Sequence, residues 1–327
     1  MNTHETDTHD PWEVTAGPAP GGAPEELLRH ALHFALTAPS PGNTQPWRFM
    51  LDDLEVLLFT DPRRALPIRD PEGQQRLVAG GAALGLLRIA LRGLGLDEMT
   101  TLLPGDHPDL LARVTLIGSV VPKPEETWLM QAAPKRRTHP GALADRPVRE
   151  RLQTRLRDMA REAGAELLLL HTSAQREAYA ARVEAALRLT EADPAARAER
   201  AAWPETGPEP FATADDRPAR GPEIVAGIPL LSVITTETDE PRAWLIAGQA
   251  LARVLVRGRV DHLQASFLHG PLARADDRYA VAEQAAVLGD LSQTPGYAQL
   301  ALRLGAGGDQ FATSRRPLSE VLLRAPP

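Results

Sequence analysis

The sequence predicts an α+β protein built from two similar halves. Helical stretches with apolar stripes surround only a few short apolar runs that suit strands, which favours helices packed around a small number of strands. A similar order of elements begins again after Pro134, with little recurrence of residue identity, which indicates a structural repeat rather than a sequence repeat. The 327 residues and 43% apolar content are enough for two modest domains or one large one with a real core.

The first half is expected over residues 24–130, after a flexible tail at 1–23 that is polar and rich in proline and glycine. A helix is predicted from Pro24 to about Ala38, because proline suits the first helical position and two glutamates follow at the positive end of the helix dipole. The other elements predicted in this half are strands at 47–51, 54–59 and 113–119 and a helix at 72–94.

Three glycines interrupt the predicted helix at 72–94. Gly80, Gly81 and Gly85 each cost roughly 1 kcal/mol relative to alanine at a helix interior position. Close approach of another backbone would account for them, so we expect this helix to be central and tightly packed.

The second half is expected over residues 131–327. Thr172 and Gln175 form the pattern of a capping box and predict a helix that runs to about Ala192. The stretch at 193–223 is rich in proline and has no periodicity, which suits a long functional loop or lid. The other elements predicted here are helices at 146–163 and 241–258 and strands at 166–170, 228–235 and 298–304.

Composition excludes several classes of function. The chain has no cysteine, so disulfides, thiolate metal sites and cysteine nucleophiles are ruled out, and no histidine motif with metal-ligand spacing is present. No apolar run approaches the ~20 residues that span a bilayer, and a net charge of −7 gives no general attraction to nucleic acid or anionic lipid. The polar, acidic N-terminus does not suit a signal peptide, so a cytoplasmic location is expected.

Polar groups are concentrated at one turn and two basic doublets. The segment A-P-S-P-G-N-T-Q-P-W-R-F at 38–49 places Ser40, Asn43 and Gln45 within six residues, more polar groups than turn formation requires. Arg136-Arg137-Thr138 and Arg315-Arg316 each stand at the edge of an element, and the planar fork of arginine suits phosphate. Either doublet alone would more commonly be a solvated basic loop.

These stretches together resemble the nitroreductase superfamily of FMN-dependent flavoproteins. Residues 38–49 are similar to that family's turn beside the flavin, and R-R-T at 136–138 is similar to its phosphate- and ribityl-binding motif. R-R-P-L-S-E-V-L at 315–322 resembles the basic tail motif, and A-S-F-L-H at 265–269 stands where the family has a loop against the flavin. The chain length and the order of the motifs resemble the Acg-like subgroup, in which one chain looks like a fused nitroreductase dimer.

The resemblance implies a layered α/β/α fold with two half-repeats that bind one FMN per chain. The cofactor would take electrons from NAD(P)H or another donor and pass hydride through flavin N5 to a small organic acceptor. The chain would act as a monomer and an internal pseudo-dimer. No dedicated catalytic side chain is required, and His269 is a weak candidate for one. The implied FMN-binding residues are Ser40, Asn43, Gln45, Arg136, Arg137, Thr138, Ser266, Arg315 and Arg316.

Departures from the family pattern keep two alternatives open. Pro140 stands where Acg-like proteins usually have another arginine, which favours a paralogue that has lost the flavin. The other alternative is a protein that binds or stores FMN, with the segment at 193–223 closed over it. In that segment Trp203 or Phe211 is expected to lie near the flavin and restrict access to it.

Overall fold

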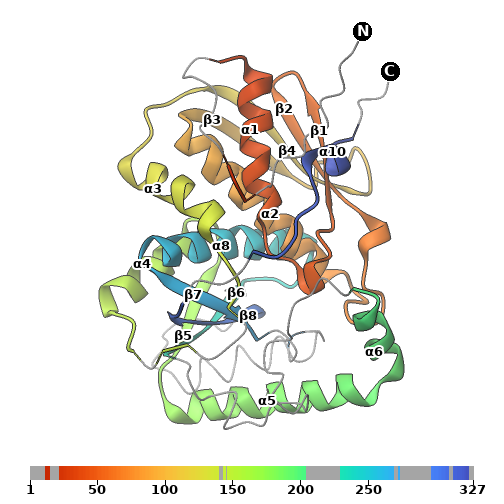
Figure 1. The fold of residues 1–327 in the computed structure, drawn as a ribbon, viewed down its shortest axis with the longest axis vertical. Helices are drawn as coiled ribbons and strands as arrows, with labels where there is room; N and C mark the ends of the chain where they lie inside the picture. The colour runs from red at the N-terminus through yellow and green to blue at the C-terminus, as the bar shows by residue number, and fades with distance from the viewer. Residues whose placement is uncertain are drawn as a thin grey trace.

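The computed structural model describes residues 12–14, 22–139, 143–144, 146–203, 229–268, 272, 296–308 and 312–323. These residues form two four-stranded antiparallel sheets with helices packed against them (Figure 1). The prediction of an α+β fold is therefore confirmed.

The two sheets have the same strand order, which is the clearest sign of a repeat. The first is ordered β1-β2-β4-β3 and the second β5-β6-β8-β7, so each strand of one sheet has a counterpart at the same place in the other. The strands of the first sheet are β1 (Trp47–Asp52), β2 (Glu55–Thr60), β3 (Leu96–Leu102) and β4 (Leu110–Ser119). Those of the second are β5 (Glu166–Leu170), β6 (Leu230–Thr236), β7 (Leu263–Phe267) and β8 (Tyr297–Ala306). The prediction of two half-repeats is confirmed.

The helices connect and cover these sheets. In the first half they are α1 (Pro24–Leu36), α2 (Gln74–Gly93) and α3 (Pro124–Ala132), with short 3-10 helices η1 (Pro41–Asn43) and η2 (Pro62–Arg64). The second half has the 3-10 helix η3 (Ala133–Lys135) and the helices α4 (Glu150–Arg161), α5 (Ser173–Ala192), α6 (Pro194–Ala201), α8 (Pro241–Val260) and α10 (Leu318–Val321). In Figure 1, α10 lies beside the first sheet although it ends the described chain.

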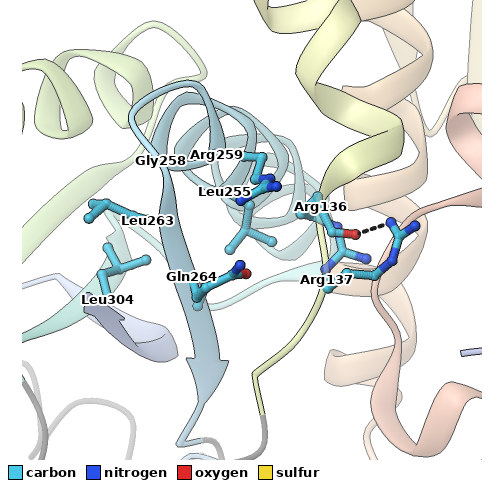
Figure 2. A pocket seen from close by; sticks show the side chains of 9 residues that line it. Arg136, Arg137, Leu255, Gly258, Arg259, Leu263, Gln264 and Leu304 are labelled. Carbon is cyan, nitrogen blue, oxygen red and sulfur yellow. Dashed lines mark hydrogen bonds between the residues drawn. The ribbon is translucent and has the colours of Figure 1, made fainter. Parts of the chain in front are cut away.

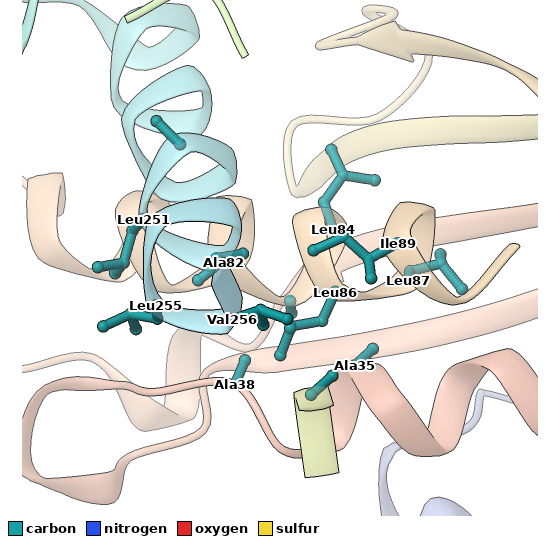
Figure 3. Close-up of a cluster of buried hydrophobic side chains, with 14 of the residues drawn as sticks. Ala35, Ala38, Ala82, Leu84, Leu86, Leu87, Ile89, Leu251, Leu255 and Val256 are labelled. Atoms are coloured by element: carbon teal, nitrogen blue, oxygen red, sulfur yellow. The ribbon is translucent and has the colours of Figure 1, made fainter. Parts of the chain in front are cut away.

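Helices α2 and α8 cross at the centre of the molecule, and glycine makes the crossing possible. A Cβ added to Gly81 would lie 2.3 Å from the carbonyl oxygen of Leu245, and one added to Gly248 would lie 2.1 Å from that of Val78. The two contacts mirror each other, since each helix presents a glycine to the partner's backbone. Figure 3 shows buried side chains of the two helices where they meet, among them Ala82 of α2 and Val256 of α8. The expected close approach of another backbone to the helix at 72–94 is confirmed.

The main hydrophobic core runs through both halves. Leu32 and Leu87 of the first half belong to the same buried cluster as Leu156, Leu255 and Leu302 of the second. A smaller cluster lies on the other side of the second sheet, where α5 contributes Tyr179, Ala180 and Val183. The shared core fixes the two halves relative to each other, and so it fixes any site between them.

Some elements differ from the sequence-based prediction. Strand β3 and helix α3 were not predicted, because β3 is an edge strand with a mixed sequence (L-D-E-M-T-T-L) and α3 buries only two side chains. The expected flavin-side loop at 265–269 is instead strand β7 as far as Phe267. The expectation of an irregular loop at 193–223 is wrong at its start, because Asp193 caps α6 by accepting a hydrogen bond from the Ala195 N–H at 2.8 Å. Residues 204–223 lie outside the described part.

None of the helices in the described part of the chain has the length and apolar character that crossing a bilayer requires.

Candidate functional site

The turn at 40–45 has an unusual backbone that its own side chains help to hold. Gly42, Asn43 and Gln45 have φ angles of 54°, 52° and 47°, a left-handed conformation that few non-glycine residues adopt. The Ser40 hydroxyl accepts a hydrogen bond from the Gln45 N–H at 2.9 Å and closes the turn. Two left-handed residues other than glycine in such a short segment mark it as a strained place, which is common at functional sites.

The amide side chains of this turn dock the C-terminal segment. The Asn43 side-chain oxygen accepts a hydrogen bond from Arg315 Nη1 at 2.7 Å, and its Nδ2 donates to the Ser314 carbonyl at 3.0 Å. The Gln45 side-chain oxygen accepts from the Arg316 N–H at 2.8 Å. The polar crowding in the turn thus joins the turn of the first half to the basic tail of the second.

The other basic motif also reaches across the halves. Arg136 is buried, and its Nη2 donates at 2.8 Å to the carbonyl oxygen of Thr37, the residue that ends α1. Arg137 donates from Nη1 to the carbonyl oxygens of Pro134 at 2.7 Å and Arg136 at 2.8 Å, two hydrogen bonds within its own segment, and its Cζ lies over the ring of Trp12. Both arginines therefore lie at the junction between the halves.

A tryptophan of the N-terminal segment holds the two basic motifs together. The ring centroid of Trp12 lies 3.8 Å from Cζ of Arg137, 4.6 Å from Cζ of Arg315 and 5.8 Å from Cζ of Arg136. Its indole N–H donates to the Thr313 carbonyl at 2.7 Å, and the residue is only 8% exposed. Trp12 falls within the stretch predicted to be a flexible tail and is instead buried against three guanidinium groups, which we call the arginine cluster.

Two members of the arginine cluster, Arg136 and Arg315, carry positive charge that no described carboxylate balances. Burial lowers the pKa of Arg136 to about 9, and the neighbouring charge of Arg137 contributes to that shift. Burial also lowers the pKa of Arg315 well below its usual value, with added repulsion from Arg136 and Arg137. No described carboxylate pairs with Arg136 or Arg315, and the Nε atom of each is buried without a hydrogen-bond partner. An anion bound here would balance the positive charge and accept hydrogen bonds from the two Nε–H groups.

Arg316 differs from the cluster, although its sequence position suggested the same role. Its Nη1 lies 3.7 Å from a carboxylate oxygen of the buried Asp61, and its Nε lies 3.4 Å from one of Glu320. Its charge is therefore balanced within the protein. A role for Arg316 in binding phosphate remains a prediction.

A shallow hollow adjoins the cluster at the edge strand of the second sheet. About 220 Å³ of space lies within it, part of which is open solvent, so it is a narrow hollow and not a preformed ligand pocket. Three of its lining residues are arginines and none is acidic, as Figure 2 shows between α8 and the segment after η3. The lining consists of Arg136, Arg137, Leu255, Gly258, Arg259, Leu263, Gln264, Ala265 and Leu304.

The remaining predicted site residues lie along β7. Thr138 forms an isolated parallel bridge with Ala265, so the R-R-T segment runs beside this strand. Ser266 is fully buried, its hydroxyl has no hydrogen-bond partner among the described residues, and it stands opposite Arg303 in the β7–β8 register. His269 lies outside the described residues, as does Pro140.

Helix α6 of the second half is hydrogen-bonded to the first half at the segment that follows η2. The carboxylate of Glu199 accepts hydrogen bonds from the backbone N–H groups of Ile68 at 2.9 Å and Arg69 at 3.0 Å. The insertion between β5 and β6 thus reaches from the second half to the segment that follows η2 (Figure 1).

Trp203, which was expected near the flavin, lies next to the strained turn. Arg64 Cζ stands 5.4 Å from the centroid of its ring, and Arg64 Nη1 donates to the Thr44 carbonyl at 2.7 Å. Arg64 therefore connects Trp203 to the turn. Phe211, the other aromatic residue of the expected lid, lies outside the described residues.

Sequence reasoning missed Trp12, Arg64 and Arg259 as members of this region. A lone tryptophan in an otherwise polar tail was the available signal for Trp12, since an indole has little reason to remain in water. The two arginines gave no signal, because arginine is frequent along the whole chain. Within the described residues, no group of three or more histidine, aspartate or glutamate side chains is placed to hold a metal ion.

Comparison with known proteins finds several that are named as nitroreductases. The proposed NAD(P)H nitroreductase Rv3131 of Mycobacterium tuberculosis is 29% identical over 323 residues, which covers 91% of both chains. The proposed NAD(P)H nitroreductase Acg of the same organism is 33% identical over 85 residues, 26% of each chain. A solved FMN-bound nitroreductase from Desulfitobacterium hafniense is 13% identical, with a TM-score of 0.42 over 61% of this chain and 98% of its own. No family model matches the sequence.

The predicted resemblance to the nitroreductase superfamily is therefore confirmed, and with Rv3131 it extends over nearly the whole chain. The two halves of the chain share one core and meet at a cluster of arginines.

Proposed function

We propose that the protein is an FMN-dependent oxidoreductase of the nitroreductase type that binds one flavin per chain at the junction of its halves. The observation that carries the proposal is the arginine cluster: Arg136, Arg137 and Arg315 converge on one ring, without a described carboxylate to pair with Arg136 or Arg315. The names of the similar proteins, several of which mention FMN or NAD(P)H, support the choice of cofactor and donor.

The described residues fit the phosphate end of FMN. A phosphate oxygen could accept hydrogen bonds from the buried Nε groups of Arg136 and Arg315, which have no other partner. Thr138 could add its hydroxyl, which lies 3.5 Å from Arg136 Nη1. The hollow is too small for the ring system of a flavin, so neighbouring segments have to move apart or complete the pocket when the whole cofactor binds.

The remaining residues suit the roles predicted from the sequence. A bound flavin supplies the chemistry, because it accepts hydride at N5 and passes it on. The protein would orient the flavin and stabilise its negative charge. Arginines would stabilise the charge of the phosphate and of a reduced ring. The amides of Asn43 and Gln45 suit the polar edge of the flavin's pyrimidine ring. In the structure described here these amides bond the C-terminal segment, so they would have to exchange partners to serve the flavin.

We propose a single chain as the functional unit, with a small organic acceptor as substrate and the cytoplasm as location. The shared core supports a single chain as the functional unit, because the two halves form between them the kind of interface that two subunits would otherwise provide. The same arrangement gives one set of R-R-T and basic tail motifs per chain.

The second candidate is a protein that binds or stores FMN with little or no turnover. Its support is helix α6, which Glu199 fastens to the first half while Trp203 stands over Arg64 beside the turn. A segment fastened there would limit the access of a second substrate to the flavin.

Reduction without oxygen separates these candidates. The protein reconstituted with FMN should lose the visible flavin absorption when NADH or NADPH is added in the absence of air. Retention of the absorption with NADH and NADPH, followed by its loss with dithionite, would favour storage. Failure to retain any flavin after reconstitution and gel filtration would overturn the proposed function and favour a paralogue that has lost its cofactor.

A further inference from the structure

We infer that Trp12 is a positioning residue of the anion site: its indole ring lies against the arginine cluster and holds the three guanidinium groups in place for a phosphate. The inference rests on the proposed function only for the identity of the phosphate-bearing ligand.

The first argument is geometric. Guanidinium groups donate hydrogen bonds from their edges, within the plane, whereas aromatic rings stack on their faces. The 3.8 Å between Arg137 Cζ and the ring centroid of Trp12 is a stacking contact. Trp12 can therefore remain on the cluster while an anion binds at the edges.

The second argument is electrostatic. Three like charges gathered around one ring repel one another, and the negative π-face of an indole offsets part of that repulsion. An anion offsets the rest through its own charge. Removal of Trp12 would allow the arginine side chains to turn outward into water. Anion binding would then have to order them again, and that cost would weaken the affinity for the anion.

The third argument is that Trp12 is anchored by the site itself. Its N–H bonds the carbonyl oxygen of Thr313, two residues before Arg315, which ties the ring to the segment that carries part of the cluster. The Nε atoms of Arg136 and Arg315 are buried without a hydrogen-bond partner among the described residues, so they could donate to an anion. Trp12 is not a member of either buried hydrophobic cluster.

The test uses Trp12→Leu, which keeps apolar bulk but removes the π-face, and Trp12→Phe, which keeps a weaker one. Trp128→Phe is the matched control, because Trp128 is 54% exposed on α3. FMN, riboflavin and inorganic phosphate are titrated against each folded variant, and dissociation constants are compared.

Trp12→Leu should weaken FMN binding by about 5- to 30-fold, with Trp12→Phe in between, as expected for the loss of cation–π contacts in a desolvated site. Riboflavin, which lacks the phosphate, should bind all variants alike, and Trp128→Phe should match the wild type. Equal FMN affinity in Trp12→Leu and wild type would overturn the inference. Tighter binding by Trp12→Leu would also overturn it, because the ring would then block the site.

The phosphate titration distinguishes this inference from the proposed function. If the wild type binds no FMN but inorganic phosphate quenches a fluorescence component that Trp12→Phe lacks, the anion site stands and the flavin proposal fails. If FMN binds equally well to all variants, the flavin proposal stands and the role of Trp12 fails. If neither FMN nor phosphate binds, both fail.

Discussion

Gly248→Ala is expected to destabilise the protein by about 3 kcal/mol in the free energy of unfolding, the upper end of the usual cost of overpacking a buried contact. The new methyl carbon would lie 2.1 Å from the carbonyl oxygen of Val78 and 2.7 Å from Cα of Gly81. Both obstacles are main-chain atoms of a buried helix, so α2 and α8 would have to separate. Urea unfolding monitored by circular dichroism measures the loss.

Gly258→Ala is the matched control, because Gly258 lies in the same helix. Its added Cβ would meet Cβ of Leu263 at 3.6 Å, an ordinary contact. Alanine is preferred to glycine inside a helix by about 1 kcal/mol, so this variant should be neutral or slightly more stable. Equal stability of the two variants would show that α2 and α8 do not cross as described, and would remove the structural basis for a fused pair of halves.

Arg137→Ala is expected to weaken FMN binding by about 1.5–3 kcal/mol, or roughly 10- to 100-fold, the usual contribution of a hydrogen bond to a charged partner. Arg137 is suited to this test because its hydrogen bonds to Pro134 and Arg136 are local. Its replacement should change the free energy of unfolding little. Quenching of flavin fluorescence gives the dissociation constant, and urea unfolding checks the fold.

Riboflavin provides the control for this variant. If Arg137 acts on the phosphate, its loss should leave riboflavin affinity close to that of the wild type. A parallel loss of both ligands would indicate a general disturbance of the site. Unchanged FMN affinity would mean that Arg137 only contacts Trp12 and does not bind the phosphate, which would then lie elsewhere.

The central fold could be predicted because its signals are local. The spacing of apolar residues and the prolines at helix starts predicted the helices at 24–38, 72–94 and 241–258 within a few residues of their observed bounds. Gly81 indicated close packing, since glycine inside a helix costs about 1 kcal/mol relative to alanine, and a close backbone contact offsets that cost. Edge strand β3 was missed because half-exposed residues of mixed polarity carry no clear period.

The site could be predicted only in part, because its geometry depends on contacts between residues far apart in the chain. The motifs gave Arg136, Arg137 and Arg315 as a phosphate-binding set, and the structure brings them together around Trp12. Nothing in the sequence indicated that Asn43 bonds Arg315, 272 positions away. A lone tryptophan in a polar tail was a signal that Trp12 is buried, but its pairing with three distant arginines leaves no local pattern.

The flavin content of the purified chain tests the central claim most directly. The protein is saturated with FMN, freed of excess cofactor by gel filtration, and analysed for bound flavin by absorbance after denaturation and for protein by amino-acid analysis. We predict one FMN per chain, in a species with the mass of a single chain, because the described residues form one strained turn and one arginine cluster at the junction of the halves. Two flavins per chain, or none, would contradict this account.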